Sequence, residues 1–210
     1  MKRIIGLLLF CIALSACAVG QRYDYGDRGA QLKFTPAPAI GIGVLDNRSY
    51  VVNGEKDPTF VGILRAGFGN PWEVRTASEK SLASEFAGTL SNALYQQGAA
   101  VKVVDLPKGS QEQAAIQMLA AAGTPRGLLV SISEWKTDTY VGSALHYDVT
   151  AKVCDANGSV IGEKRIMGKD DLGSNAWNPK GHAEHEVSKA YRAKLEELLN
   201  SAEIARALAP

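Results

Sequence analysis

The stretch GLLVSISEW, residues 127–135, decides the fold of this 210-residue chain. Its first half is apolar without polar alternation, which is typical of a strand that is covered on both faces. Such a strand lies in the interior of a sheet rather than at its edge. We therefore predict a central strand over 127–135 and read the rest of the sheet outward from it.

The residues that follow predict two further strands in succession. Residues 136–144 (KTDTYVGSA) are expected to turn the chain, and residues 145–153 (LHYDVTAKV) alternate between apolar and polar side chains. The DANG sequence of 155–158 predicts a hairpin turn, because Asn-Gly is the favoured pair at its centre. Residues 159–168 are then expected to return as the neighbouring strand.

The residues before the central strand predict strands that alternate with helices. Strands are expected over 39–46 (AIGIGVLD) and 100–106 (AVKVVDL). A helix is expected over 77–97, opened by a capping box of Thr76 and Glu79, and a second helix over 110–122, opened by a box of Ser110 and Gln113. Residues 47–53 read as a turn and a short strand, and 54–75 as irregular, with a short strand possible at 61–64.

A last helix begins after residue 177. Asn178 suits the N-cap and Pro179 the first helical position. Val187, Tyr191, Leu195 and the stem of Lys194 line its inner face, and a short helix can follow Ser201. The predicted order is β-α-β-α-β-β-β-α, which indicates an α+β fold: a mixed β-sheet with packed helices, in a single domain over 39–210.

The first 17 residues, MKRIIGLLLFCIALSAC, have the three parts of a secretory signal: a basic start, an apolar run and small residues at the end. The apolar run is too short for a spanning helix, which needs ~20 apolar residues. A buried first helix or strand is the alternative, but packing requires neither the basic start nor the small-residue end. We therefore predict a signal peptide over 1–16.

The order Leu14-Ser15-Ala16-Cys17 resembles the lipobox of bacterial lipoproteins. The resemblance implies cleavage before Cys17 and an N-acyl diacylglyceryl lipid on that residue, and stable anchoring requires two or more acyl chains. Ala18, where an aspartate favours inner-membrane retention, implies the inner leaflet of the outer membrane, with the domain in the periplasm. Soluble secretion with an unmodified Cys17 is the alternative.

Residues 17–38 are predicted to be the lipidated cysteine and a flexible tether, because glycines, prolines and charges alternate there without a period. Of the three cysteines, Cys11 leaves with the signal and Cys17 is modified. Cys154 then has no partner, so no disulfide is expected. Cys154 is expected to be a small side chain at a strand end, with a reactive or intermolecular thiol as the alternative.

The charge balance bears on the class of partner. The formal net charge of +1 becomes −1 once the two basic residues of the signal are removed, since no acidic residue precedes Cys17. A nucleic-acid-binding protein would show a basic excess. We therefore expect no nucleic-acid partner.

No catalytic set is recognisable in the sequence. The Gly41-Ile42-Gly43 pair lacks the third glycine and the helix of a dinucleotide site, and neither G-x-S-x-G nor H-E-x-x-H occurs. His182 and His185, three residues apart, could form a surface metal site but are expected to be a polar helix end. We predict no catalytic residue, no metal and no cofactor besides the lipid; a hydrolase that uses His146 and Asp148 is the remaining enzymatic alternative.

Aromatic residues at the ends of elements are the better candidates for binding. Trp135 and Tyr140 flank the predicted hairpin tip, and Trp72 and Trp177 lie in predicted loops. Exposed aromatic side chains are typical of recognition surfaces, although the same residues also serve as lids of a core. We predict that these four residues contact a partner, and an edge strand there could also accept a partner's strand.

The chain resembles the YajG-like group of bacterial outer-membrane lipoproteins, and more loosely the small α/β domains of CsgG-like and LpoB-like proteins. The resemblance rests on the lipobox, the helix ending LSNALYQQG, the strand LLVSISEW, the hairpin TDTYVGSALHYDVTAKVCDANG and the last amphipathic helix. It implies a non-enzymatic lipoprotein of the cell envelope that binds another envelope protein or itself. A small-ligand or peptidoglycan-binding module that uses residues 54–75 and Trp72 is the alternative.

Overall fold

Strand β6 (Arg126–Thr139) is the centre of the sheet in the computed structural model, which describes residues 21–26, 29–65, 70–175 and 177–210. Its first half pairs in parallel with β2 (Ala39–Asp46), and its last residues pair in parallel with β3 (Phe60–Arg65). Its whole length pairs antiparallel with β7 (Ser143–Asp155). Residues 127–132 are all buried, which confirms that the apolar stretch is covered on both faces.

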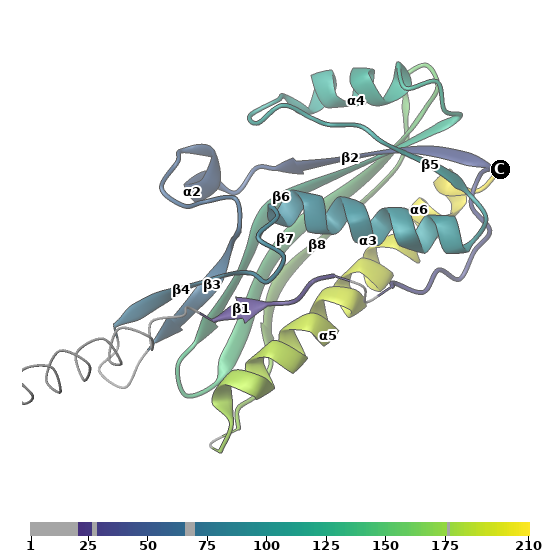
Figure 1. Ribbon diagram of the computed structural model, residues 1–210. Coiled ribbons are helices and arrows are strands. Elements are labelled where there is room, and N and C mark those ends of the chain that lie inside the picture. The colour runs from purple at the N-terminus through teal and green to yellow at the C-terminus, as the bar shows by residue number, and fades with distance from the viewer. Residues whose placement is uncertain (1–20, 27–28, 66–69, 176) are drawn as a thin grey trace, which may run out of the picture.

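The described elements form one α+β domain with a curled mixed sheet, as predicted (Figure 1). The remaining strands are β1 (Arg22–Tyr23), β4 (Pro71–Thr76), β5 (Ala100–Val103) and β8 (Val160–Asp171). The helices are α2 (Ser49–Val52), α3 (Leu82–Gln96), α4 (Glu112–Ala120), α5 (Pro179–Leu199) and α6 (Ala202–Leu208). One path across the sheet runs β1-β4-β3-β6-β2-β5, and β7 and β8 continue from β6.

Helices cover the two faces of the sheet unequally. Helices α3, α5 and α6 pack on one face and bury the main core, which extends from Ile40 and Phe86 to Tyr191 and Leu208 (Figure 1). Helix α4 alone covers the other face, near the start of β6, through a small cluster that includes Leu119. On the rest of that second face, β7 presents His146, Asp148, Thr150 and Lys152, and β8 presents the exposed Met167.

The hairpin from β7 to β8 follows the sequence pattern closely. The apolar positions of 145–153 are buried and the polar positions are half-exposed, as the alternation predicts. Gly158 has φ +80°, and the Asp155 side chain accepts hydrogen bonds from the amides of Asn157 and Ser159. The turn over 136–144 was predicted too long: β6 runs to Thr139 and β7 begins at Ser143.

Neither predicted capping box caps its helix in the structure. Helix α3 begins at Leu82, and Ser81 caps it by accepting from the amide of Ser84 at 3.2 Å. Thr76 ends β4 instead, and its hydroxyl donates to the carbonyl of Lys80. Helix α4 begins at Glu112 without a side-chain cap, because the Ser110 hydroxyl donates to the carbonyl of Pro107.

Residues 54–75 are not irregular throughout. They contain the antiparallel pair β3–β4, in which Leu64 lies opposite Trp72. The short strand predicted within 47–53 is the short helix α2 instead. Glycine-rich connections hid this hairpin, since its strands are short and β3 has a bulge between Phe60 and Gly62.

The predicted tether over 17–38 does not fit its described part. Tyr23, Tyr25, Ala30, Leu32 and Ala37 are all buried in the main core, and β1 pairs with β4. The domain therefore includes residues 21–26 and 29–38, rather than beginning at residue 39. Cys17 and the signal over 1–16 lie outside the described residues.

Candidate functional site

Trp135, predicted to contact a partner, is completely buried. A bulge in β6 between Ile132 and Glu134 shifts the alternation, so that Trp135 points into the core with Leu128 and Ile132. Its ring packs edge-to-face against Tyr25, Phe86 and Tyr191, and its Nε1 donates to the Tyr25 hydroxyl at 3.2 Å. The prediction for this residue is wrong, and Trp135 is a core residue.

The other three predicted residues are exposed: Trp72 by 49%, Tyr140 by 54% and Trp177 by 98%. Val141, beside Tyr140 in the turn between β6 and β7, is exposed by 78%. Trp72, Tyr140 and Trp177 therefore stay candidates for partner contact.

These exposed side chains belong to one end of the domain. Trp72 lies opposite Leu64 on β3, and Leu64 lies beside Thr139 at the end of β6, so Trp72 and Tyr140 are two strands apart. The loop that carries Trp177 joins the same end, because the amide of Ser143 donates to the carbonyl of Gly173 at 2.9 Å. We call Trp72, Tyr140, Val141 and Trp177 the aromatic end. In Figure 1 the free ends of β3 and β4, the β6–β7 turn and the start of α5 lie together, away from α4 and the C-terminus.

The first described residues also lie at the aromatic end. The Gln21 side-chain amide donates to the carbonyl of Lys180 in the first turn of α5, and the backbone carbonyl of Gln21 accepts from the amide of Arg75. Strand β1 runs parallel to β4 and pairs with its last two residues, Arg75 and Thr76, so the N-terminal end of β1 points toward the end of β4 that carries Trp72. The chain therefore enters the domain beside the aromatic end.

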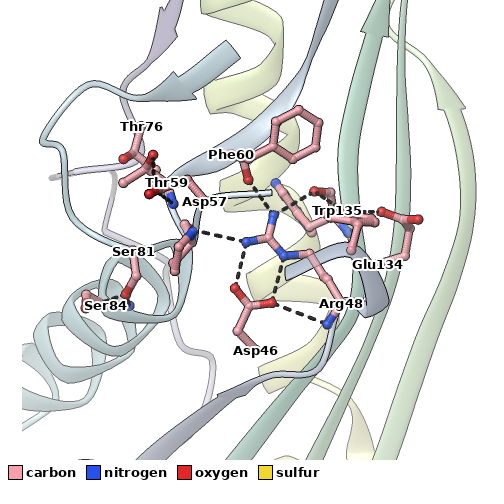
Figure 2. A network of polar contacts seen from close by, with 12 residues as sticks. Asp46, Arg48, Asp57, Thr59, Phe60, Thr76, Ser81, Ser84, Glu134 and Trp135 are labelled. Atoms are coloured by element: carbon pink, nitrogen blue, oxygen red, sulfur yellow. Dashed lines mark hydrogen bonds and ion pairs between the residues drawn. The ribbon is translucent and has the colours of Figure 1, made fainter. Parts of the chain in front are cut away.

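A buried arginine, which the sequence did not mark, ties the sheet together at the end of β2 (Figure 2). Arg48 forms a two-bonded ion pair with Asp46, at 2.7 and 2.6 Å. Its remaining N–H groups donate to the carbonyls of Pro58, Phe60 and Trp135. Burial alone would lower the pKa of Arg48, but the hydrogen bonds and charge of Asp46 outweigh burial and raise it.

A groove of about 180 Å³ adjoins this network, between the end of β2, the start of α3 and the loop before α4. Asp46, Ser81, Leu106 and Lys108 are among the residues that line it, and Trp72 is not. The Asp46 carboxylate is held by Arg48, and Ser81 caps α3. The groove can accept an apolar group, but two of its polar side chains, Asp46 and Ser81, are already engaged in holding the fold.

The catalytic and metal candidates of the sequence are spread apart or engaged. Arg165 binds Asp148 with two hydrogen bonds and holds the pKa of that carboxyl below its ordinary value, so Asp148 does not orient His146. The ring of His182 bonds to the carbonyl of Leu172, and His185 pairs with Glu186. Within the described ranges, no group of three or more His, Cys, Asp or Glu side chains could hold a metal ion.

Cys154 is buried, and burial raises the pKa of its thiol. It packs in the small cluster under α4, as expected for a small side chain near a strand end. No helix in the described part of the chain is long and apolar enough to span a membrane.

Strand β8 offers a second surface. Among the described strands it pairs only with β7, along 144–154, so the backbone groups of its other edge have no strand partner. Met167, in the middle of β8, is exposed by 63%. A 12-residue edge of this kind can accept a strand from another chain.

Comparison with known proteins supports the fold. Neither a protein-family model nor a curated protein sequence matches this chain. The crystal structure of protein XCC0632 from Xanthomonas campestris, of the DUF330 family model, superposes with a TM-score of 0.52 at 11% identity, over 88% of this chain and 95% of that one.

Two other solved structures are more distant. The PelC dodecamer from Paraburkholderia phytofirmans gives a TM-score of 0.43 at 13% identity, over 87% of this chain and 95% of that one. The C-terminal domain of LpoB from Salmonella enterica gives 0.32 at 14%, over 66% and 88%. The YajG-like resemblance stays a prediction, and the superposition on the Xanthomonas protein shows that the two chains share a fold.

Proposed function

We propose that this chain is a bacterial lipoprotein, anchored through Cys17 to the inner leaflet of the outer membrane, whose periplasmic domain binds another envelope protein or a second copy of itself. The observation that carries the proposal is the sequence LSAC at 14–17, which ends a basic and then apolar segment. A lipid on Cys17 supplies the several acyl chains that stable anchoring requires.

Two observations on the domain support binding rather than catalysis. Three of the acid–base candidates serve structural contacts: Asp148 with Arg165, His182 with the carbonyl of Leu172, and His185 with Glu186. The exposed edge of β8 is a surface that recognises backbone rather than small molecules, because an added strand bonds along the whole edge.

The lipid anchor is tested in the bacterium that makes the protein. Mass analysis of the mature wild-type chain should find an N-terminal Cys17 that carries a diacylglyceryl group and an amide-linked acyl chain. Cys17→Ala should abolish this mass increment and release the chain from the outer-membrane fraction, whereas Cys154→Ala should leave both unchanged. A wild-type chain without lipid refutes the anchor.

The binding surface is tested by photo-crosslinking in intact cells. A photoreactive residue at Met167 on β8 should give a discrete adduct, whose mass identifies either a second copy or another envelope protein. The matched control is Tyr95, which is exposed by 73% on α3 and lies away from the β8 edge. Equal adducts at both positions, or none at Met167, would show that β8 is not the binding edge.

A further inference from the structure

The aromatic end has the composition of a surface that meets a lipid bilayer. Trp72, Tyr140 and Trp177 combine an apolar ring with a polar N–H or O–H group, and Val141 adds an aliphatic side chain at the tip of the β6–β7 turn. Tryptophan and tyrosine are enriched where proteins contact the boundary between headgroups and acyl chains, because one side of the ring is apolar and the other stays hydrated.

The exposed aromatic side chains sit on ordered elements. Trp72 belongs to β4 and pairs with Leu64, which packs against the main core. Tyr140 and Val141 stand in a turn closed by a hydrogen bond from the amide of Tyr140 to the carbonyl of Gly142. The amide of Trp177 donates to the Asn175 side chain at 2.9 Å. The surface is therefore held in place by the fold, at little entropic cost to binding.

The position of the proposed anchor selects a bilayer as the occupant of this surface. Gln21 lies close to the aromatic end, and only three residues, 18–20, separate it from Cys17. The four Cα–Cα steps from Cys17 to Gln21 span at most ~14 Å even when fully extended. A lipid on Cys17 thus keeps this end, and not the opposite end with α4, close to the headgroups.

We propose that the aromatic end is a membrane-contact surface that inserts its side chains into the phospholipid interface and so orients the domain on the inner leaflet. This inference rests on the proposed lipid anchor. The acyl chains hold the protein at the membrane, and the aromatic end fixes which way the domain faces. Strand β8 is then held at a defined angle to the bilayer for its partner.

The tryptophans themselves provide the test. The mature, lipidated chain is reconstituted in vesicles of phosphatidylethanolamine and phosphatidylglycerol whose acyl chains are brominated, since bromine quenches nearby tryptophan emission. In the wild type, emission from Trp72 and Trp177 should be lost on transfer from unbrominated to brominated vesicles. In Trp72→Phe/Trp177→Phe only buried Trp135 emits, and its emission should be unchanged.

A matched control places a tryptophan at another site. Tyr95→Trp in the Trp72→Phe/Trp177→Phe background exposes an indole on the last turns of α3, which lead into β5 at the other end of the sheet. This tryptophan should not be quenched. Circular dichroism of each variant confirms that it is folded.

The outcomes separate this inference from the proposed function, because mass analysis of the same sample reports the lipid. Lipid with selective quenching of Trp72 and Trp177 supports the membrane-contact surface. Lipid without quenching, or with equal quenching of the residue 95 tryptophan, overturns it and leaves the anchor intact. A chain without lipid overturns both. Unquenched tryptophans overturn the membrane-contact surface whether the chain sediments as a monomer or as a dimer.

Discussion

Arg48 shows how one side chain can connect three segments of a sheet. The guanidinium has five N–H donors, and all five meet an oxygen: two on Asp46 and three on carbonyls of Pro58, Phe60 and Trp135. The carbonyls belong to the chain entering β3 and to the bulge region of β6. In the sequence, LDNRS at 45–49 reads only as a polar turn after a strand, so nothing in it marks Arg48 as buried.

Replacing Arg48 by Met is expected to destabilise the domain by about 3–5 kcal/mol, because Asp46 then keeps a poorly hydrated charge without a partner. Urea unfolding followed by circular dichroism measures this loss. The double variant Arg48→Met/Asp46→Leu should recover part of it, since the orphaned carboxylate is gone. An exposed ion pair contributes at most about 1 kcal/mol to the free energy of unfolding. If Arg48→Met lowered the free energy of unfolding by no more than about that amount, the network would add little to stability.

The neighbouring elements β3 and β6 approach each other closely at one glycine. A Cβ at Gly62 would overlap the Thr137 side chain and lie 2.8 Å from its carbonyl oxygen. The Thr137 hydroxyl donates to the carbonyl of Val61 at this point, which adds a side-chain bond between the two strands. Glycine at 62 therefore lets the β3–β4 hairpin, with Trp72 at its end, join the sheet.

Gly62→Ala is expected to cost about 1–3 kcal/mol or more, because the added methyl group forces β3 away from β6. Gly88→Ala is the matched control: Gly88 lies in α3, and its added Cβ would meet no atom within 4 Å beyond its chain neighbours and the nearby backbone of α3. Alanine there should stabilise the domain by up to ~1 kcal/mol. Thermal unfolding of both variants measures the contrast, and similar effects at the two positions would contradict the close approach of the strands.

The ion pair of Asp148 on β7 with Arg165 on β8 makes the stability of the domain depend on pH. Hydrogen bonds and charge from Arg165 lower the pKa of Asp148 below its ordinary value of 3.8. A carboxyl whose pKa is lower in the folded chain than in the unfolded chain stabilises the fold when the pH is above the unfolded pKa. This contribution is lost as the pH falls through the folded pKa. The free energy of unfolding should therefore decline below about pH 4.

Urea titrations at a series of pH values from about 6 to 2.5, in steps of about half a unit, measure this decline. Arg165→Met should make it shallower, because Asp148 then titrates near its ordinary value. Lys164→Met removes the same charge from the same strand, at a position for which the described residues supply no ion pair, and should leave the slope unchanged. Equal slopes in all three proteins would rule out the Asp148–Arg165 pair as a source of the acid dependence.

Sequence periodicity predicted the long elements and not their ends. The alternation of 145–153 and the apolar run of 127–132 follow from which side chains are buried. This pattern can be recognised in the sequence of one strand without knowing its partners. The start of α3 depends instead on β4 ending at Thr76 and on Ser81 taking the cap, a competition between two local solutions. Trp135 was misplaced for a similar reason, because the bulge before Glu134 reverses which face each later residue occupies.

At the scale of the whole molecule, the candidate surface is assembled from segments that are distant in sequence. Trp72, Tyr140 and Trp177 lie at the same end of the domain because β3 adds to β6 and the loop after β8 bonds to Ser143. The sequence predicted each residue as a candidate, but the pairing that gathers them is non-local. The same holds for Tyr25, whose place between Trp135 and Tyr191 converts an apparent tether into part of the core.

This placement makes the true N-terminal boundary of the domain testable. A chain that begins at Ala39 lacks the buried side chains of Tyr23, Tyr25 and Leu32, together with β1. Burial of each large side chain contributes about 1.5–3 kcal/mol, so their combined loss approaches the roughly 5–15 kcal/mol by which a domain is stable. We expect residues 39–210 to be unfolded or molten, with no cooperative thermal transition.

Residues 18–210, which keep those side chains but lack Cys17, should fold with a sharp transition seen by near-ultraviolet circular dichroism. The near-ultraviolet signal is the decisive measurement, because it reports the fixed packing of Trp135 against Tyr25 and Tyr191. If the chain from Ala39 gave the same signal and the same midpoint as the longer one, residues 21–38 would be a tether after all. The anchor at Cys17 could then hold the domain at any angle, whereas a packed segment fixes the entry of the chain beside Trp72.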